Sequence, residues 1–149
     1  MSRILIGIDP DITKSGVALI NGDKKELYNL NFFELFDFFN QVLLQKGASE
    51  EILIVIEAGW LNGGNWHTKN KGSAALNAKI GNNTGRNHET GRKIVEMCEY
   101  LEIPFKLLKP TTSKLKAKIF KSITKIEGRT NQETRDAMML IFNMKTNHN

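Results

Sequence analysis

The sequence has little of what marks secreted or membrane proteins. It contains a single cysteine, Cys98, which excludes an internal disulfide and fits a reducing compartment. No apolar run is long enough to span a bilayer, so we expect no membrane partner. The first residues also lack the charged and then apolar pattern of a secretory signal. We therefore expect a cytosolic protein, or one made in the cytosol of a host.

The sequence also lacks internal repeats and any segment with the composition of a linker. Its 149 residues, 40% of them hydrophobic and 25% charged, are ordinary for one globular domain with a real core. We therefore predict a single domain over residues 1–149.

Acidic residues are scarce in the second half of the chain. Residues 66–149 carry 16 Lys and Arg against 7 Asp and Glu, whereas residues 1–65 carry 5 against 9. A basic surface of this kind is typical of a protein that binds a polyanion such as nucleic acid. A lysine-rich surface that is merely well solvated would give the same count.

The order of the apolar patterns predicts an α/β domain with a mixed sheet. Continuous apolar runs indicate strands buried on both faces, and the NGD turn at residues 21–23 indicates a hairpin. The Gly- and Asn-rich residues 59–85 predict a long functional loop, with a helical part around Ala74–Ile80. We expect strands at residues 3–9, 16–20, 25–32, 52–59 and 103–108, and helices at 33–46, 86–101, 113–123 and 132–144.

Carboxylates follow two of the buried strands and border one packed helix face. Asp9 ends the apolar run ILIGI, and Glu57 ends the run ILIVI. In the last helix Asp136 lies four residues before Leu140 of the apolar stripe, so it borders the face that packs on the sheet. Glu133 lies three residues before Asp136, on the same side. Because a buried charge is costly without a partner, this pattern predicts a bound cation.

Oxygen ligands of this kind suit hard divalent cations such as Mg²⁺ or Mn²⁺. Two such ions, about 3.5–4 Å apart, can activate a water and stabilise the leaving oxygen in phosphodiester hydrolysis. A negative metal pocket beside a basic surface therefore predicts a nuclease, in which the surface holds the backbone and the pocket cuts it.

Each acid also has a purely structural interpretation when it is considered alone. Asp9 and Glu57 could be solvated strand ends, and Asp9 could bond the turn at residues 10–15. Glu133 could close a capping box with Thr130 at the start of the last helix. The joint occurrence of acids on two strand ends and one packed helix face favours the metal site.

Three motifs, IGIDPDITKSGVALI, ILIVIEAGW and NQETRDAMMLIF, resemble those of the RuvC-type Holliday junction resolvases of the ribonuclease H-like superfamily. The resemblance covers nearly the whole chain in element order and is specific at these motifs. It implies a five-stranded mixed sheet flanked by helices, a homodimer, and Mg²⁺-dependent paired nicks in four-way DNA junctions. The short, lysine-rich chain also fits a phage or prophage member, in the cytoplasm of a bacterial cell or a phage-infected host.

The resemblance also implies which residues form the site. The first-strand acid is Asp9, the fourth-strand acid is Glu57, and the pair on the last helix is Glu133 and Asp136. These four residues would be catalytic and would hold two Mg²⁺ ions, or Mn²⁺, with no small-molecule cofactor. Because the family often has Asp where Glu133 stands, direct metal binding by Glu133 stays open. No catalytic histidine is expected, because methionines follow Asp136.

Trp60 stands three residues after Glu57, where the family places an aromatic residue. Its ring could wedge between or stack on unpaired bases at the crossover, or it could anchor a surface loop. The apolar side of the helix expected at residues 86–101 would serve the dimer interface, as in the family.

A lysine-rich helix is the other expected DNA-binding element. Lys114, Lys118 and Lys121 share one face of the helix expected at residues 113–123, by their spacing. We expect them to contact phosphate, although a solvated helix face is the alternative. Arg86 would extend this DNA-binding track.

Other functions remain open beside junction resolution. A nuclease of the same fold that acts on RNA, an RNA–DNA hybrid or other branched DNA would need the same residues. A non-catalytic junction-binding module would be expected to lack an acid, and none is missing. An ATPase of the actin or hexokinase type begins with a similar strand but needs two lobes, for which 149 residues leave no room. We therefore predict a structure-selective, metal-dependent endonuclease that resolves four-way DNA junctions.

Overall fold

The computed structural model describes residues 2–62, 73–111 and 113–144. Within them lie strands, α-helices and a short 3-10 turn, η1. In chain order these are β1 (Arg3–Asp9), β2 (Ser15–Asn21), β3 (Lys24–Leu30), α1 (Phe32–Gln45), β4 (Glu51–Glu57), η1 (Gly59–Leu61), α2 (Ala74–Tyr100), β5 (Phe105–Leu108), α3 (Ala117–Thr124) and α4 (Gln132–Ile141). Among the described residues, none of the helices combines the length and the apolar character needed to cross a membrane.

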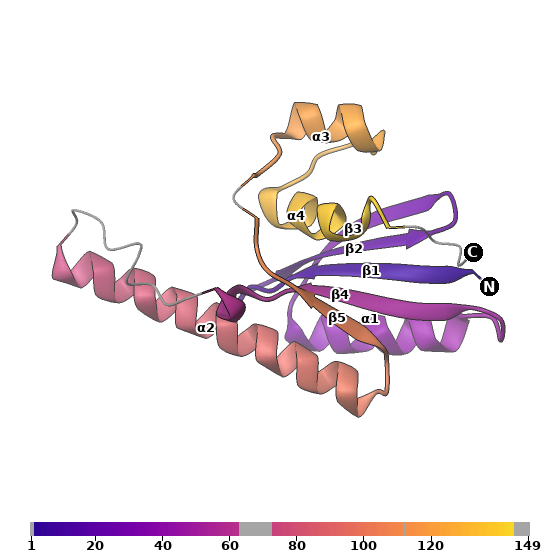
Figure 1. Ribbon diagram of the computed structural model, residues 1–149, viewed down its shortest axis with the longest axis horizontal. Helices are drawn as coiled ribbons and strands as arrows, with labels where there is room; N and C mark the ends of the chain where they lie inside the picture. The colour runs from indigo at the N-terminus through magenta and orange to yellow at the C-terminus, as the bar shows by residue number, and fades with distance from the viewer. Residues whose placement is uncertain (1, 63–72, 112, 145–149) are drawn as a thin grey trace.

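The strands form one five-stranded sheet in the order β3-β2-β1-β4-β5 (Figure 1). The first three strands make an antiparallel meander, whereas β4 runs parallel to both β1 and β5. Ile8 pairs with Ile56 across β1 and β4, so the next residues, Asp9 and Glu57, lie at the same edge of the sheet. The predicted α/β fold, a five-stranded mixed sheet flanked by helices, is confirmed.

Helices cover both faces of this sheet (Figure 1). The core beneath α1 and α2 includes Ile6 of β1. The core beneath α4, with α3 beyond it, includes Leu5 of β1 and Val55 of β4. Because side chains alternate along a strand, Asp9 and Glu57 face the same side as Leu5 and Val55, toward α4.

Two glycines allow α4 to lie directly on the sheet. A Cβ atom at Gly7 of β1 would overlap the backbone carbonyl oxygen of Ala137. One at Gly16 of β2 would overlap the backbone carbonyl of Glu133. This close approach brings the first turns of α4, which carry Asp136, down to the level of the strand ends.

The helix α2 is longer than the sequence predicts. Residues 74–85, expected to form part of a loop with only a short helical stretch, belong to the same continuous helix as residues 86–100. The Ser73 side chain caps its first turn by accepting from the backbone N–H of Leu76 at 3.1 Å. Residues 63–72 of the predicted loop lie outside the described residues. Helix propagation from a docked C-terminal half explains why glycine-rich sequence stays helical here.

The lysine-rich helix is shorter than expected, which corrects the placement of one predicted site residue. Helix α3 begins at Ala117, with Lys116 as its N-cap, and not at residue 113. The preceding backbone is tied to α4 instead, because the Leu115 carbonyl accepts a hydrogen bond from Arg135 at 2.9 Å. Lys114 therefore does not share a helix face with Lys118 and Lys121.

Candidate active site

Three carboxylates from three separate elements meet at the edge of the sheet. Asp9 ends β1, Glu57 ends β4, and Asp136 lies in the second turn of α4. One oxygen atom of each lies within 4.8 Å of the others, and all three residues are half-buried. Three of the four acids predicted from the sequence are therefore brought together, within reach of a single cation.

Burial and neighbouring acids disfavour the ionised forms of Asp9 and Glu57. Burial, together with the charges of Glu57 and Asp136, raises the pKa of Asp9 to about 8, although Lys114 acts in the opposite direction. Burial also raises the pKa of Glu57, where the charge of Lys114 opposes it and that of Asp136 adds to it. The cluster is therefore short of positive charge and is chemically suited to binding a cation.

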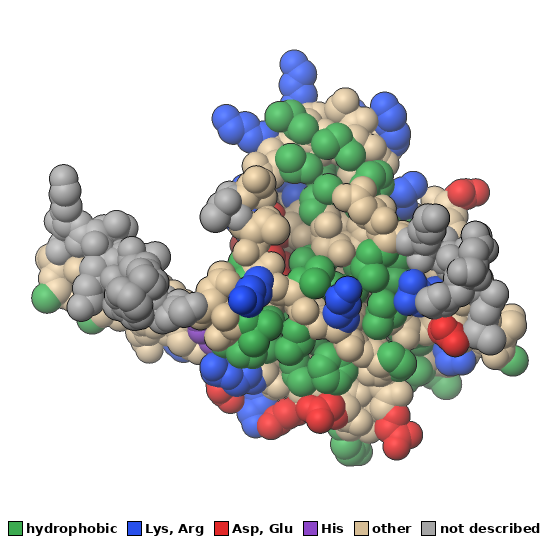
Figure 2. All heavy atoms as spheres, viewed as in Figure 1, with side chains coloured by type: hydrophobic (Ala, Val, Ile, Leu, Met, Phe, Trp, Pro, Cys, Tyr) green, Lys and Arg blue, Asp and Glu red, His purple; other side chains and the backbone are tan. Residues whose placement is uncertain are grey.

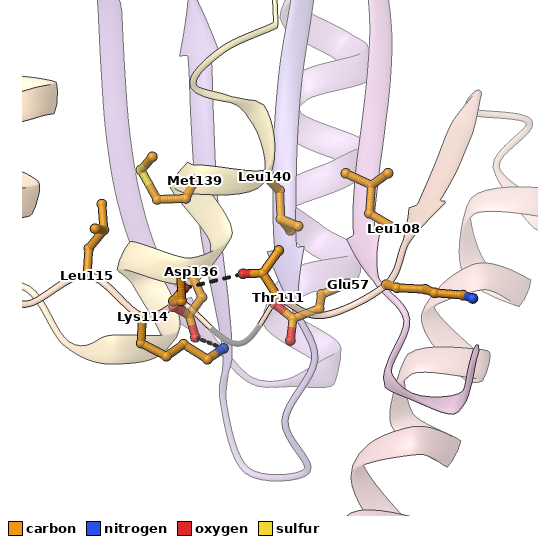
Figure 3. A pocket seen from close by; sticks show the side chains of 10 residues that line it. Glu57, Leu108, Thr111, Lys114, Leu115, Asp136, Met139 and Leu140 are labelled. Carbon is orange, nitrogen blue, oxygen red and sulfur yellow. Dashed lines mark hydrogen bonds and ion pairs between the residues drawn. The ribbon is translucent and has the colours of Figure 1, made fainter. Parts of the chain in front are cut away.

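Lys114 supplies part of the missing positive charge (Figure 3). Its Nζ donates to Oδ2 of Asp136 at 2.8 Å, and the side chain keeps 43% of its surface exposed against 12% for Asp136. Burial by itself would lower the pKa of Lys114, but its hydrogen bond to Asp136 and the neighbouring carboxylates together raise it. Lys114 thus reaches into the carboxylate cluster from the segment before α3.

The other oxygen of Asp136 is also held. Gln132, one turn earlier in α4, donates from Nε2 to Oδ1 at 2.8 Å. With Lys114 on Oδ2, both oxygens of Asp136 accept hydrogen bonds, which fixes the plane of its carboxylate. Gln132 was not among the predicted site residues, since a glutamine on the first turn of a helix carries no distinctive signal.

Glu133 lies on the first turn of α4 but outside this tight group. Its charge contributes to the raised pKa of Asp9, as the smallest of the named causes, so it lies near the cluster. The predicted capping box of Thr130 and Glu133 is wrong. Asn131 is the N-cap, and it exchanges hydrogen bonds with Thr134. The role of Glu133 in metal binding stays a prediction.

The turn after β1 does not need Asp9. The carboxylate of Asp11 accepts from the backbone N–H groups of Thr13 and Lys14, at 3.0 and 3.4 Å. The backbone N–H of Ile12 donates to Asn87 of α2 at 2.9 Å, which ties the turn to that helix. The interpretation of Asp9 as a turn-forming residue is therefore wrong, because Asp11 performs that role.

Two cavities meet at Glu57. One, of about 120 Å³, extends toward Lys114 and Asp136 and is drawn in Figure 3. The other, of about 240 Å³, lies on the α2 side and is lined by Asp9, Trp60 and His88 among others. Burial and the charge of Arg92 lower the pKa of His88. The sequence predicted no catalytic histidine, and the presence of His88 in this cavity follows from how α2 docks.

Trp60 packs against α2. A Cβ atom at Gly91 would overlap its ring, and the guanidinium of Arg92 lies 5.7 Å from the ring centroid. Its ring also contacts the core between the sheet and α2. These contacts favour the anchoring interpretation of Trp60, and base stacking stays a prediction.

Basic side chains gather around α3, near the top of Figure 2. Lys121 pairs with Glu127 at 2.8 Å, whereas Lys118 is exposed and has no ion-pair partner among the described residues. Arg86 is exposed on α2. The predicted phosphate contacts are therefore spread over α3, α2 and the segment that carries Lys114.

The fold and the site together define an α/β protein with a cluster of acidic side chains, suited to binding a cation, at the ends of two parallel strands.

Neither a protein family nor a curated protein matches the sequence. Among solved structures, the chain is similar to Thermus thermophilus RuvC in complex with a Holliday junction substrate, at 16% identity and a TM-score of 0.48, over 93% of this chain and 89% of that one. A second structure of Thermus thermophilus RuvC is similar at 14% identity and a TM-score of 0.48, over 92% and 90%. At this identity, residue roles do not transfer between the chains.

Proposed function

We propose that the protein is a metal-dependent, structure-selective endonuclease that resolves four-way DNA junctions by phosphodiester hydrolysis. The observation that carries the proposal is the meeting of Asp9, Glu57 and Asp136 within 4.8 Å, in a site that raises the pKa of Asp9. Carboxylates with purely structural roles have no reason to converge from two strands and a helix at such electrostatic cost.

The donor set fits a hard divalent cation. Asp9, Glu57 and Asp136 offer only oxygen atoms, as Mg²⁺ and Mn²⁺ prefer, and Glu133, whose charge acts on Asp9, is proposed as a further ligand. Bound there, such ions would supply an activated water and charge stabilisation at the leaving oxygen. The raised pKa of Asp9 means that cation binding has to displace a proton from this residue at neutral pH.

The chain's own residues would then bind and orient the backbone. Lys114 can transfer its hydrogen bonds from Asp136 to a phosphate oxygen of the scissile strand, because its side chain is partly exposed. Lys118 and Arg86 would hold flanking phosphates, and the basic second half of the chain supplies the long-range attraction.

Four-way junctions are proposed as the substrate on the resemblance of the three acid-bearing motifs to RuvC-type resolvases. Paired nicks would require two sites, so the proposal includes a homodimer. An RNA–DNA hybrid or other branched DNA is the second candidate substrate, because the same acids would serve it. A junction-binding module without catalysis is disfavoured, since all the acids are present.

The test is a cleavage assay with Mg²⁺ on a labelled four-way junction, a linear duplex and an RNA–DNA hybrid. We expect paired nicks in the junction only, and their loss in Asp136→Asn with junction binding retained. Cleavage of the hybrid instead would keep the metal chemistry and overturn the substrate. Tight junction binding without any cleavage would overturn the enzyme.

Removal of the Lys114 ammonium should separate cation binding from cleavage. In Lys114→Met we expect Mn²⁺ affinity to be retained or increased, because a competing positive charge leaves the carboxylates. We expect cleavage to fall by about 10²-fold, as for loss of one charge-stabilising donor. Calorimetric titration and single-turnover cleavage measure the two effects. Unchanged cleavage would show that Lys114 only neutralises the carboxylates when no cation is bound and has no part in cleavage.

Loss of the Lys118 charge should weaken DNA binding without affecting the chemistry. In Lys118→Gln we expect the slope of log K against log[salt] to fall by about 0.9, one phosphate contact, with single-turnover cleavage at saturation unchanged. Lys25→Gln, on an exposed lysine of β3 near the hairpin, is the matched control. Equal salt slopes for both variants and the wild type would remove α3 from the DNA interface.

A further inference from the structure

Arg135 is half-buried and, among the described residues, forms no ion pair with the acidic cluster, although it precedes Asp136 in sequence. All of its described partners are neutral oxygen atoms. Its Nε donates to the Leu115 carbonyl at 2.9 Å, and Nη1 donates to the Thr130 carbonyl and hydroxyl at 3.2 and 2.8 Å. Its Nη2 donates to Oε1 of Gln132 at 3.1 Å. So many directed bonds indicate a fixed guanidinium.

One arm of this network ends on Asp136. Gln132 accepts from Arg135 at its Oε1 and donates to Oδ1 of Asp136 from its Nε2. Because the guanidinium has only donors, it forces the amide oxygen toward itself and the amide NH₂ toward the carboxylate. Without Arg135 the amide could reverse, and an oxygen would then face the negative charge of Asp136.

The other arm of the network holds the backbone segment that carries Lys114. The Leu115 carbonyl, held by Arg135, belongs to the residue directly after Lys114. This bond ties the non-helical segment before α3 to the start of α4, and Lys114 reaches Oδ2 of Asp136 from there. The two groups that hold Asp136, Gln132 and Lys114, therefore depend on one guanidinium.

We propose that Arg135 is a positioning residue of the candidate active site. It orients the Asp136 carboxylate toward Asp9 and Glu57 through Gln132, and it holds Lys114 beside that carboxylate through the Leu115 backbone. The inference rests on the proposed function only for its effect on cleavage, since the orientation of Asp136 can be measured as cation affinity without any DNA. A lysine lacks the planar fork and cannot make both arms.

The test is a double-mutant cycle on Mn²⁺ affinity, measured by calorimetry and by the Mn²⁺ electron paramagnetic resonance signal of the folded protein. We expect Arg135→Met and Gln132→Met each to weaken Mn²⁺ binding by about 10- to 100-fold through loss of the Gln132 arm, the range for groups that orient a metal ligand, while release of Lys114 in Arg135→Met acts in the opposite direction. The double variant should be little weaker than Arg135→Met, because Gln132 acts downstream of it. Arg129→Met, at an exposed arginine of the loop before α4, should bind Mn²⁺ like the wild type.

A merely structural arginine would behave differently. If the role of Arg135 were only structural, Arg135→Met would have a lower melting temperature but the same Mn²⁺ affinity as the wild type in its folded molecules. That result would overturn the inference and leave the proposed function standing. Failure of the wild type to bind Mn²⁺ would overturn both the inference and the proposed function. Should Arg135→Met not fold, Arg135→Lys carries the test: about 10-fold weaker Mn²⁺ binding supports the inference, and wild-type affinity overturns it.

Discussion

Asp9→Asn is expected to abolish cleavage while making the metal-free protein more stable. Ionised Asp9 is unfavourable in the folded state, since burial and the neighbouring acids raise its pKa to about 8 from an ordinary 3.8. Asparagine has no charge to bury but is a poor ligand for Mg²⁺, so cleavage should fall by about 10³-fold or more. The position is therefore one where the fold and the function make opposite demands on the same side chain.

The pH window of this effect follows from the two pKa values. Below pH 4, Asp9 is protonated in both the folded and the unfolded chain, and its ionisation does not penalise folding. From about pH 4 to about 8, the unfolded chain has lost the proton while the folded protein retains it, so stability falls as the pH rises. The slope is at most about 1.4 kcal/mol per pH unit for one proton, giving a few kcal/mol above pH 8.

Urea unfolding in EDTA between pH 3 and pH 9 measures this difference. Wild type and Asp9→Asn should have similar stability at the acid end and diverge as the pH rises. Mg²⁺ should stabilise the wild type at pH 8 and have little effect on the variant. Asp37→Asn, at an exposed position on α1, is the matched control and should follow the wild type. Parallel curves for wild type and Asp9→Asn would contradict a buried, crowded Asp9.

Gly7→Ala should disrupt the carboxylate cluster by displacing α4 from the sheet. The added methyl group would overlap the backbone carbonyl of Ala137, and a backbone atom cannot rotate away as a side chain can. Helix α4 must then move off the sheet and take Asp136 with it. We expect the free energy of unfolding to fall by about 3 kcal/mol, the upper range for overpacked cores. Cleavage by the folded fraction should fall by about 10²-fold, because small displacements of reacting groups are costly.

Gly85→Ala is the matched control for this substitution. Gly85 lies within α2, and a Cβ atom there would meet nothing within 4 Å. Because alanine favours the helix, the variant should be more stable by about 0.5–1 kcal/mol and should cleave normally. Urea unfolding and single-turnover cleavage of the two variants give the comparison. A stable, active Gly7→Ala would show that the close approach of α4 does not set the position of Asp136.

The sheet and the three converging acids were predictable because strong local signals specify them. Continuous apolar runs that end in Asp9 and Glu57 indicate neighbouring buried strands, and the parallel register then places both acids at one edge. The spacing of Asp136 from the apolar stripe of its helix placed it toward the sheet. These inferences needed only strand alternation and helix periodicity.

The parts that could not be predicted depend on tertiary contacts. The N-terminal half of α2 has no apolar stripe that packs on the core. Its sequence therefore shows no helical periodicity of apolar residues from which the helix could be predicted. Residues 113–116 have helical spacing but lie before α3, where the Leu115 carbonyl accepts a hydrogen bond from Arg135. The positions of Gln132 and His88 beside the acids follow from helix docking, which one sequence does not reveal. Asn131 displaced Thr130 as the cap because boundaries are the weakest part of any sequence pattern.

The central claim is that Asp9, Glu57 and Asp136 form a divalent cation site. Crystals grown with Mn²⁺ and measured near the manganese absorption edge test it most directly. We predict an anomalous peak within coordination distance of all three carboxylates, with the Lys114 ammonium displaced from Asp136. An anomalous map without a peak at these carboxylates, and with the 2.8 Å contact of Lys114 and Asp136 preserved, would contradict the account.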